Sequence, residues 1–428
     1  MFSTWGALTG LAIAIVLIVR KATPAYALVL GALLGGLLGG GGLPETVGAM
    51  VSGAQSMMPS VLRILTSGVL AGALVKTGSA EKIADAIIRA LGARFALAAI
   101  AIATLIVTAV GVFVDIAVIT VAPVALAVGR RAGLPVPALL LAMVGGGKAG
   151  NVISPNPNTI AAADAFGVDL TALMMKNIVP ALCALAVTVA IATVMAKKRL
   201  LCGDDGHTGR VPLPDDDESG ALGDRALPGI WAALTGPIVV VALLALRPVC
   251  GFAVDPLVAL PAGGAVSILA CGRWRHTAAY CEYGLSKVVG VSTLLIGTGA
   301  VAGIVKGSGL NADMIALLNA CHLPAFALAP LSSVLLSGAT ASTTAGVTIA
   351  AQTFSGTLVG AGVPALSAAA MLHAGGTIFD ALPHGSFFHA TAGAVGMGVK
   401  DRLKLFPFGT LVGATTTITS VIVYLAGG

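Results

Sequence analysis

The sequence predicts an all-α polytopic membrane protein made of two inverted-topology repeats, each with a re-entrant hairpin and a discontinuous helix. Three observations predict this class. The chain of 428 residues is 57% hydrophobic and only 10% charged. Its apolar runs have the length of membrane helices, and the same order of apolar segments occurs twice, each time with one segment broken by glycine and proline.

The charged residues predict the orientation in the membrane. The net charge of +6 does not indicate a nucleic-acid partner, because the basic residues cluster at the ends of apolar runs. These clusters are Arg20/Lys21, Arg130/Arg131, Lys197 to Arg199, Arg273/Arg275 and Lys400/Arg402/Lys404. Positively charged loops remain on the cytoplasmic side. We therefore expect an inner (plasma) membrane protein with a cytoplasmic central linker and both termini outside.

Each half is expected to contain seven apolar segments. In the first half they are expected at 5–19, 25–42, 61–75, 95–111, 116–128, 139–167 (broken) and 178–196. In the second half they are expected at 227–246, 256–271, 288–305, 325–336, 345–359, 365–396 (broken) and 406–425. The charged stretch between the halves is typical of a solvated linker. The predicted domains are a first repeat (1–196), a linker (197–226) and a second repeat (227–428).

Two sequence matches predict that the halves arose by duplication. LAGALVKTGSAEKIADAI at 70–87 resembles AVAGIVKGSGLNADMIAL at 300–317, which places Lys76 opposite Lys306. The same offset, about 230 residues, brings Gly146/Gly147 close to Gly375/Gly376. Repeated similarity at one offset indicates internal repeats. Because seven crossings is an odd number, the second copy is expected to enter from the opposite side, and such repeats place a binding site near the membrane midplane.

The fourth and fifth segments of each half are expected to form re-entrant hairpins. They join at TAVGVFVDIAV, which contains Asp115, and at SGATASTTAGV, which contains Ser342, Thr343 and Thr344. Junctions with so few polar residues are poorly suited to the headgroup layer. The two hairpin tips are therefore expected to meet near the middle of the membrane.

The broken segments read GGKAGNVISPNPNTIAAADAFG at 146–167 and GGTIFDALPHGSFFHATAGAVG at 375–396. Irregular backbone at membrane depth survives only where it lines a cavity or packs against protein. Paired broken helices are typical of the binding site of a secondary transporter. The start of a helix also favours an anion, because its backbone N–H groups and dipole are positive there.

The predicted substrate-binding residues lie at these breaks and at the second hairpin tip. They are Lys148, Asn151, Ser154, Asn156, Asn158, Thr159, Ser342, Thr343, Thr344, Asp380, His384 and Ser386. Structural roles are the alternative. The polar groups at the breaks can satisfy broken backbone, small hydroxyl residues are common packing surface, and Lys148 can bridge Asp380 instead of a substrate carboxylate.

Asp115 and Asp380 are the sharpest candidates. An acid at the centre of a spanning helix costs about 2.5–3.5 kcal/mol on insertion scales. Apolar surroundings favour the neutral form of a carboxyl group, which makes Asp115 the predicted proton-coupling residue. Either acid can instead cap the start of a helix.

These segments carry a family resemblance. The run VDIAVITVAPVALAVGRRAGLP, preceded by LAGALVKTGSAEKIADAI and followed by NVISPNPNTIAAADAFGVDL, resembles the gluconate permease family of organic-anion:proton symporters, within the ion transporter superfamily. In that family an acid occupies the position of Asp115. The broken segment there usually has a Pro-Pro-His-Pro core, where this chain has Ser154, Pro155, Asn156 and Pro157. Near its end the family commonly has Asn-Asp-Ser after a histidine, where this chain has Pro383, His384, Gly385 and Ser386.

The resemblance implies a homodimer, with a scaffold domain and a moving transport domain in each subunit. It also implies proton-coupled symport of a small organic anion, such as gluconate, another sugar acid or a hydroxycarboxylate. Sodium is the alternative coupling ion, because the carbonyls of unwound segments coordinate it well.

An intramembrane enzyme is the alternative of another class, and a channel is a third. No HExxH, GxSxG or P-loop pattern occurs, and the run Asp215 to Glu218 lies in the linker. The six cysteines have no metal-ligand spacing. We expect no catalytic residue, no metal and no other cofactor.

Overall fold

The prediction of an all-α protein is confirmed. The structure is a computed structural model that describes residues 2–201, 227–250, 252, 254–320, 323–383 and 385–427. Within these ranges the regular structure is helical, and the only β pairing is an isolated bridge between Phe2 and Ser308. Four helical segments of the same ranges are long and apolar enough to cross a membrane: Met58–Lys76, Ile178–Lys197, Trp274–Lys306 and Val399–Leu425.

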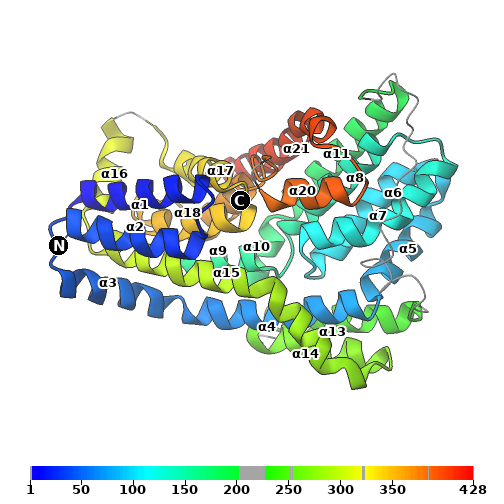
Figure 1. Ribbon diagram of the computed structural model, residues 1–428, viewed down its shortest axis with the longest axis horizontal. Helices are drawn as coiled ribbons and strands as arrows, with labels where there is room; N and C mark the ends of the chain where they lie inside the picture. The colour runs from blue at the N-terminus through cyan, green and yellow to red at the C-terminus, as the bar shows by residue number, and fades with distance from the viewer. Residues whose placement is uncertain are drawn as a thin grey trace.

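The described part of the first half contains eleven helices and one 3-10 turn (Figure 1). They are α1 (Thr4–Val19), α2 (Pro24–Leu38), α3 (Leu43–Ser56), α4 (Met58–Lys76), α5 (Ser79–Leu91), η1 (Ala93–Phe95), α6 (Ala96–Ala109), α7 (Val114–Arg131), α8 (Val136–Asn151), α9 (Pro157–Phe166), α10 (Leu170–Lys176) and α11 (Ile178–Lys197).

The described part of the second half follows the same order with fewer interruptions. It contains α13 (Ile230–Cys250), α14 (Pro256–Ala270), η2 (Trp274–His276), α15 (Thr277–Lys306), α16 (Leu310–Ala320), η3 (Ala325–Ala327), α17 (Leu328–Thr340), α18 (Thr343–Gly360), α19 (Ala365–Gly375), α20 (Ser386–Gly393) and α21 (Val399–Leu425).

Four helices lie where the sequence predicted no segment: α3, α5, α16 and the seven-residue α10. Two others, α15 and α21, begin well before their predicted segments. α3, α5 and α16 escaped the search for long apolar runs because polar residues interrupt them. α5 is amphipathic and buries Ile83, Ala84 and Ile88. α15 has 30 residues and begins at Thr277. Only its apolar part was predicted, because Glu282 and Lys287 interrupt the apolar run in the first part of the helix.

The helices sort into two packing groups that do not follow the two halves of the sequence. We call α1–α4 and α13–α15 the frame group, in which α15 packs against α2, α3 and α4, and α14 against α4 and α13. We call α6–α11 and α17–α21 the hairpin group, in which α8 packs against α6 and α11, and α18 against α17 and α9. In Figure 1, α15 crosses the lower part of the molecule beside α3 and α4.

Packing between the two groups is concentrated in three helix pairs. These are α15 with α18, α4 with α9, and α1 with α17. α5 and α16 follow α4 and α15 in the chain and connect the frame group to the hairpin group. The groups are therefore joined by two connecting helices and a sparse interface.

Packing also repeats between the halves. α2 contacts α15 as α14 contacts α4, and α6 contacts α8 as α17 contacts α19. A Cβ atom on Gly146 would lie 2.1 Å from the carbonyl oxygen of Ala101, and one on Gly375 would lie 2.6 Å from that of Pro330. The element order and contacts agree with a duplication, whereas the opposite orientation of the two copies stays a prediction.

Candidate functional site

A cavity of ≈ 810 Å³ opens between the frame group and the hairpin group. The frame group lines it with the α1–α2 connection and one face of α15. The hairpin group lines it with both hairpin tips and residues from both helix breaks. Pockets for small molecules typically measure about 300–1,000 Å³. The segments that the sequence singled out therefore meet around one cavity of suitable size.

The first hairpin places Asp115 at this cavity. α6 and α7 are joined by residues 110–113, where Gly111 has a φ of 110° that favours glycine. Asp115 lies in the first turn of α7, and its Oδ1 accepts a hydrogen bond of 2.9 Å from the backbone N–H of Ile116. α6 has 14 residues, a rise of about 21 Å, which is less than the hydrocarbon core of about 30 Å. This length suits a re-entrant hairpin.

The second hairpin is held against the second break. It turns at Ala341, whose φ of 47° is in the left-handed region and is unusual for a residue with a Cβ. The Ser342 Oγ accepts a bond of 3.3 Å from the backbone N–H of Ala345. Thr343 Oγ1 donates to Asp380 Oδ2 at 2.8 Å. Gly385, in the second break, lies so close to the turn of the second hairpin that a Cβ atom on it would be 2.4 Å from the Ala341 carbonyl oxygen.

An asparagine network closes the first break. Asn156 Oδ1 caps α9 by accepting bonds from the backbone N–H groups of Asn158 (2.9 Å) and Thr159 (3.1 Å). Asn156 Nδ2 donates to Asn151 Oδ1 at 2.6 Å, and Asn158 Nδ2 donates to the same oxygen at 3.1 Å. Asn151 and Asn158 line the cavity, whereas Asn156 does not.

Ser154 and Thr159 also bond to backbone. Thr159 Oγ1 donates to the Ser154 carbonyl oxygen at 2.6 Å, and Ser154 Oγ donates to the Thr108 carbonyl oxygen at 2.7 Å. Both residues are buried and neither lines the cavity. These two side chains, with Asn156, satisfy the interrupted backbone and tie the break to the first hairpin.

Lys148 is buried and paired. Its ammonium lies 2.7 Å from Asp380 Oδ1, and the two side chains are only 1% and 5% exposed. It also donates to the carbonyl oxygens of Thr377 (2.7 Å) and Gly409 (3.3 Å). Of the roles open to Lys148, the structure shows the bridge to Asp380. Asp380 itself lines the cavity, whereas Lys148 does not.

A second buried cation lies near Asp380. Arg402 is only 2% exposed. Its Nη2 donates to Thr391 Oγ1 at 3.4 Å, and its guanidinium lies 5.4 Å from the centre of the Phe388 ring. Two buried cations, Lys148 and Arg402, therefore act electrostatically on the single carboxylate of Asp380.

Lys287 on α15 is a cavity residue that the sequence reasoning missed. Its side chain is exposed and lines the cavity together with Asp115. Its ammonium lies 4.9 Å from the centre of the Tyr283 ring and forms no ion pair within 4 Å among the described residues, although it acts electrostatically on Asp115. Lys21, from the α1–α2 connection, is a further lysine of this wall. The available signal for Lys287 was a lone charge next to a predicted span, which by itself does not indicate a site.

The remaining predicted residues divide as follows. Ser342, Thr343, Thr344 and Ser386 line the cavity. His384 lies outside the described residues. His389, which the sequence did not single out as a binding residue, lines the cavity, and its Nε2 lies 2.7 Å from the Pro383 carbonyl oxygen.

Comparison of the sequence with known families and proteins gives three similarities of different strength. The sequence matches the family described as GntP family permease over residues 4–426. A Haemophilus influenzae protein named as an uncharacterized transporter is 50% identical over 422 residues, which are 99% of this chain and 98% of the relative. An uncharacterized permease of the same organism is 29% identical over 175 residues, 40% of this chain and 36% of the relative.

Among solved structures, the YdaH transporter of Alcanivorax borkumensis, described as having an unusual topology, is similar with a TM-score of 0.68. The similarity covers 90% of this chain and 89% of that chain at 18% sequence identity. At this identity the similarity shows a shared fold.

Proposed function

The chain belongs to the GntP permease family and is a multi-pass membrane transporter, and from this premise we propose that it carries a small organic anion together with protons across the inner membrane. The observation that carries the proposal is the arrangement of the larger cavity. Both hairpin tips, the first of which carries Asp115, and both helix breaks meet there and face Lys287 of the frame group.

The cavity wall favours an anion that carries hydroxyl groups. Lys287 and Lys21 supply positive charge, and the first turns of α7, α9, α18 and α20 border the space. Helix starts attract negative charge through their backbone N–H groups and dipoles. Amides and hydroxyls of Asn151, Asn158, Thr344 and Ser386 line the same wall. This combination matches a carboxylate on a short polyhydroxylated chain, as in a sugar acid or a hydroxycarboxylate.

The charge balance requires coupling. Moving a monoanion into a cell that is negative inside costs about 2.3 kcal/mol per 100 mV. One accompanying cation cancels this cost, and a second is needed to gain from the potential. Asp115 is the proton-carrying group in our proposal because it lies at a hairpin tip, lines the cavity and has no cationic hydrogen-bond partner among the described residues.

The test is uptake into proteoliposomes under an imposed proton gradient, with gluconate and other sugar acids as substrates. We expect Asp115→Asn, which mimics the protonated acid, to abolish uphill accumulation. Exchange of labelled for unlabelled substrate should partly survive, since a neutral carrier still alternates when loaded. Asp401→Asn is the matched control, because Asp401 is an exposed aspartate paired with Lys404 on the same helix (2.8 Å).

The outcomes separate the alternatives. Accumulation by Asp115→Asn under a proton gradient would exclude Asp115 as the proton carrier. Accumulation by the unmodified protein that follows a sodium gradient and ignores the proton gradient would replace protons by sodium. Chemical conversion of the substrate, detected by mass spectrometry, would favour an enzyme.

A further inference from the structure

A second, smaller cavity of ≈ 220 Å³ is lined by elements that correspond to those around the larger cavity. The α13–α14 connection, α4 and α9 line the smaller one. The α1–α2 connection, α15 and α20 line the larger one. By their order in the two halves, the α13–α14 connection corresponds to the α1–α2 connection, α4 corresponds to α15, and α9 corresponds to α20. The two cavities therefore occupy corresponding places in the two halves.

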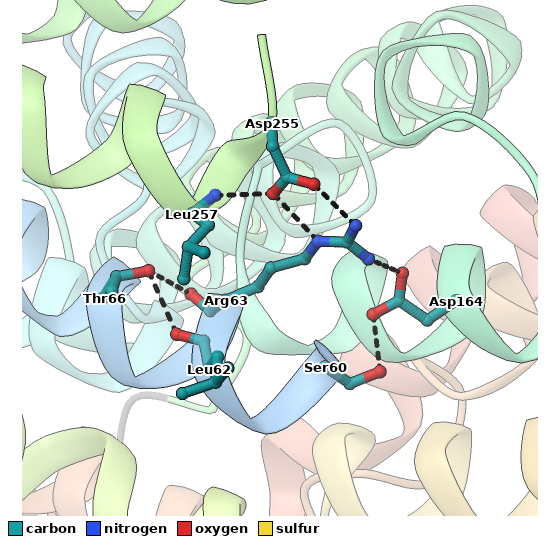
Figure 2. Close-up of polar contacts among 7 residues, drawn as sticks. All are labelled: Ser60, Leu62, Arg63, Thr66, Asp164, Asp255 and Leu257. Atoms are coloured by element: carbon teal, nitrogen blue, oxygen red, sulfur yellow. Dashed lines mark hydrogen bonds and ion pairs between the residues drawn. The ribbon is translucent and has the colours of Figure 1, made fainter. Parts of the chain in front are cut away.

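The two cavities differ in the side chains that α4 and α15 contribute at corresponding positions. The offset of about 230 residues that aligns Lys76 with Lys306 also places Ser60 opposite Gly290 and Arg63 opposite Thr293. Gly290 and Thr293 are wall residues of the open, larger cavity. Ser60 and Arg63 instead make polar bonds to Asp164, as Figure 2 shows, and Arg63 and Asp164 line the smaller cavity.

Arg63 bridges two aspartates. Its Nε donates to Asp255 Oδ1 at 3.0 Å and its Nη2 donates to Asp255 Oδ2 at 2.7 Å. Its Nη1 donates to Asp164 Oδ1, and Ser60 Oγ donates to Asp164 Oδ2. In Figure 2 the guanidinium lies between the two carboxylates. Both oxygens of Asp164 are thus held by side chains of α4.

This network crosses the boundary between the two packing groups. Ser60 and Arg63 are on α4, and Asp255 is the N-cap of α14, so all three belong to the frame group. Asp164 is on α9 in the hairpin group. The pair α4–α9 is one of the three places where the groups pack together. A relative movement of the two groups at this place would separate Asp164 from Arg63.

Asp255 is suited to retain Arg63 after that separation. The hydrogen bonds from Arg63 hold the pKa of Asp255 below its usual range. Asp255 therefore stays ionised at neutral pH, and the bidentate pair keeps the guanidinium on the frame group. Bidentate pairs between arginine and a carboxylate are strong and geometrically specific.

We propose that the bonds from Arg63 and Ser60 to Asp164 form a gate that closes a second mouth of the transport pathway while the larger cavity is open. The proposal rests on the proposed transport function, since a carrier must close one mouth as it opens the other. When the hairpin group moves, Asp164 leaves α4, Arg63 remains on Asp255, and the smaller cavity widens into the opposite entrance.

The test measures the accessibility of both mouths in purified protein. The six native cysteines are replaced by serine. One reporter cysteine is then placed in the smaller cavity (Thr171→Cys) or in the larger cavity (Thr293→Cys), since both threonines line those walls. We expect Asp164→Asn to raise the maleimide labelling rate at position 171 by about tenfold or more, because bonds to a charged group are lost. The labelling rate at position 293 should fall.

Two further variants keep the result interpretable. Asp401→Asn neutralises an exposed aspartate whose ion pair lies within α21, and it should change neither rate. Ser60→Ala removes one hydrogen bond to Asp164 but leaves the negative charge of Asp164 in place. This variant should raise the labelling rate at position 171 by a few-fold. Gel filtration establishes that each variant is folded.

The experiments distinguish a failure of the gate proposal from a failure of the proposed function. If folded Asp164→Asn and Ser60→Ala label at the same rates as the parent while the parent transports an organic anion, the gate is wrong and the transport proposal stands. If both reporters shift as expected but no organic anion is carried, the gate stands and the substrate assignment is wrong.

Discussion

Lys148 and Lys287 are both lysines on helices, yet their environments give them opposite roles. Lys148 is 1% exposed and paired with Asp380, whereas Lys287 is exposed at the wall of the larger cavity. Breaking a buried ion pair by removing one partner leaves an uncompensated charge in the interior. Removing an exposed lysine leaves no such charge.

At this scale we predict that the two Lys→Gln variants separate stability from affinity. Lys148→Gln should lower the free energy of unfolding by about 3–5 kcal/mol. Lys287→Gln should leave thermal unfolding unchanged and weaken binding of a sugar acid by about ten- to a hundredfold, the loss expected for a hydrogen bond to a charged group. Thermal unfolding and equilibrium binding of the purified variants measure both effects.

Lys197→Gln is the control, since Lys197 is exposed at the end of α11 and away from both cavities. Unchanged affinity in Lys287→Gln would remove Lys287 from the substrate site. Full stability in Lys148→Gln would show that the buried pair is not needed for folding.

At the scale of helices, glycine determines how closely the broken segments approach the hairpins. α8 packs against α6, and a Cβ on Gly146 would lie 2.1 Å from the Ala101 carbonyl oxygen. This distance is shorter than any normal contact, so the two backbones must separate to admit a methyl group. Close approach of helices through small residues is characteristic of membrane proteins.

We expect Gly146→Ala to destabilise the protein by about 1–3 kcal/mol, the usual effect of overpacking. Gly48→Ala is the matched control within a helix, because a Cβ there meets nothing within 4 Å. Alanine at position 48 should be neutral or stabilising by up to about 1 kcal/mol. Thermal unfolding in detergent measures both, and equal stability of the two variants would contradict the packing argument.

At the scale of the whole molecule, the predicted inverted arrangement of the two repeats determines which side of the membrane each loop is expected to face. The basic clusters predict that the central linker lies in the cytoplasm and the end of α13 on the outside. In single-cysteine variants, an impermeant maleimide added to intact cells should label Cys250, at the end of α13, and should spare Cys202 of the linker. Labelling of Cys202 but not Cys250 would reverse the orientation.

Most of the helical architecture could be predicted from the sequence. Membrane helices reveal themselves through long apolar runs, and proline with glycine marks their breaks, because both signals are local. The hairpins around Asp115 and Ser342 and the breaks at 146–167 and 375–396 were found this way, and the structure places residues from all four segments around one cavity. The amphipathic helix α5 and the short helix α16 were missed because neither contains such a run.

The division of roles among polar residues was decided by tertiary structure. Asn156 and Asn158 are two positions apart, yet Asn156 caps α9 while Asn158 reaches the cavity. Lys148 forms an ion pair with Asp380 from the other half of the chain. Lys287 lines the cavity because α15 packs beside the hairpin group. The Arg63 bridge joins three helices distant in sequence. A sequence records which groups can donate or carry charge, but partners brought together from far along the chain determine which of those groups remain free to bind.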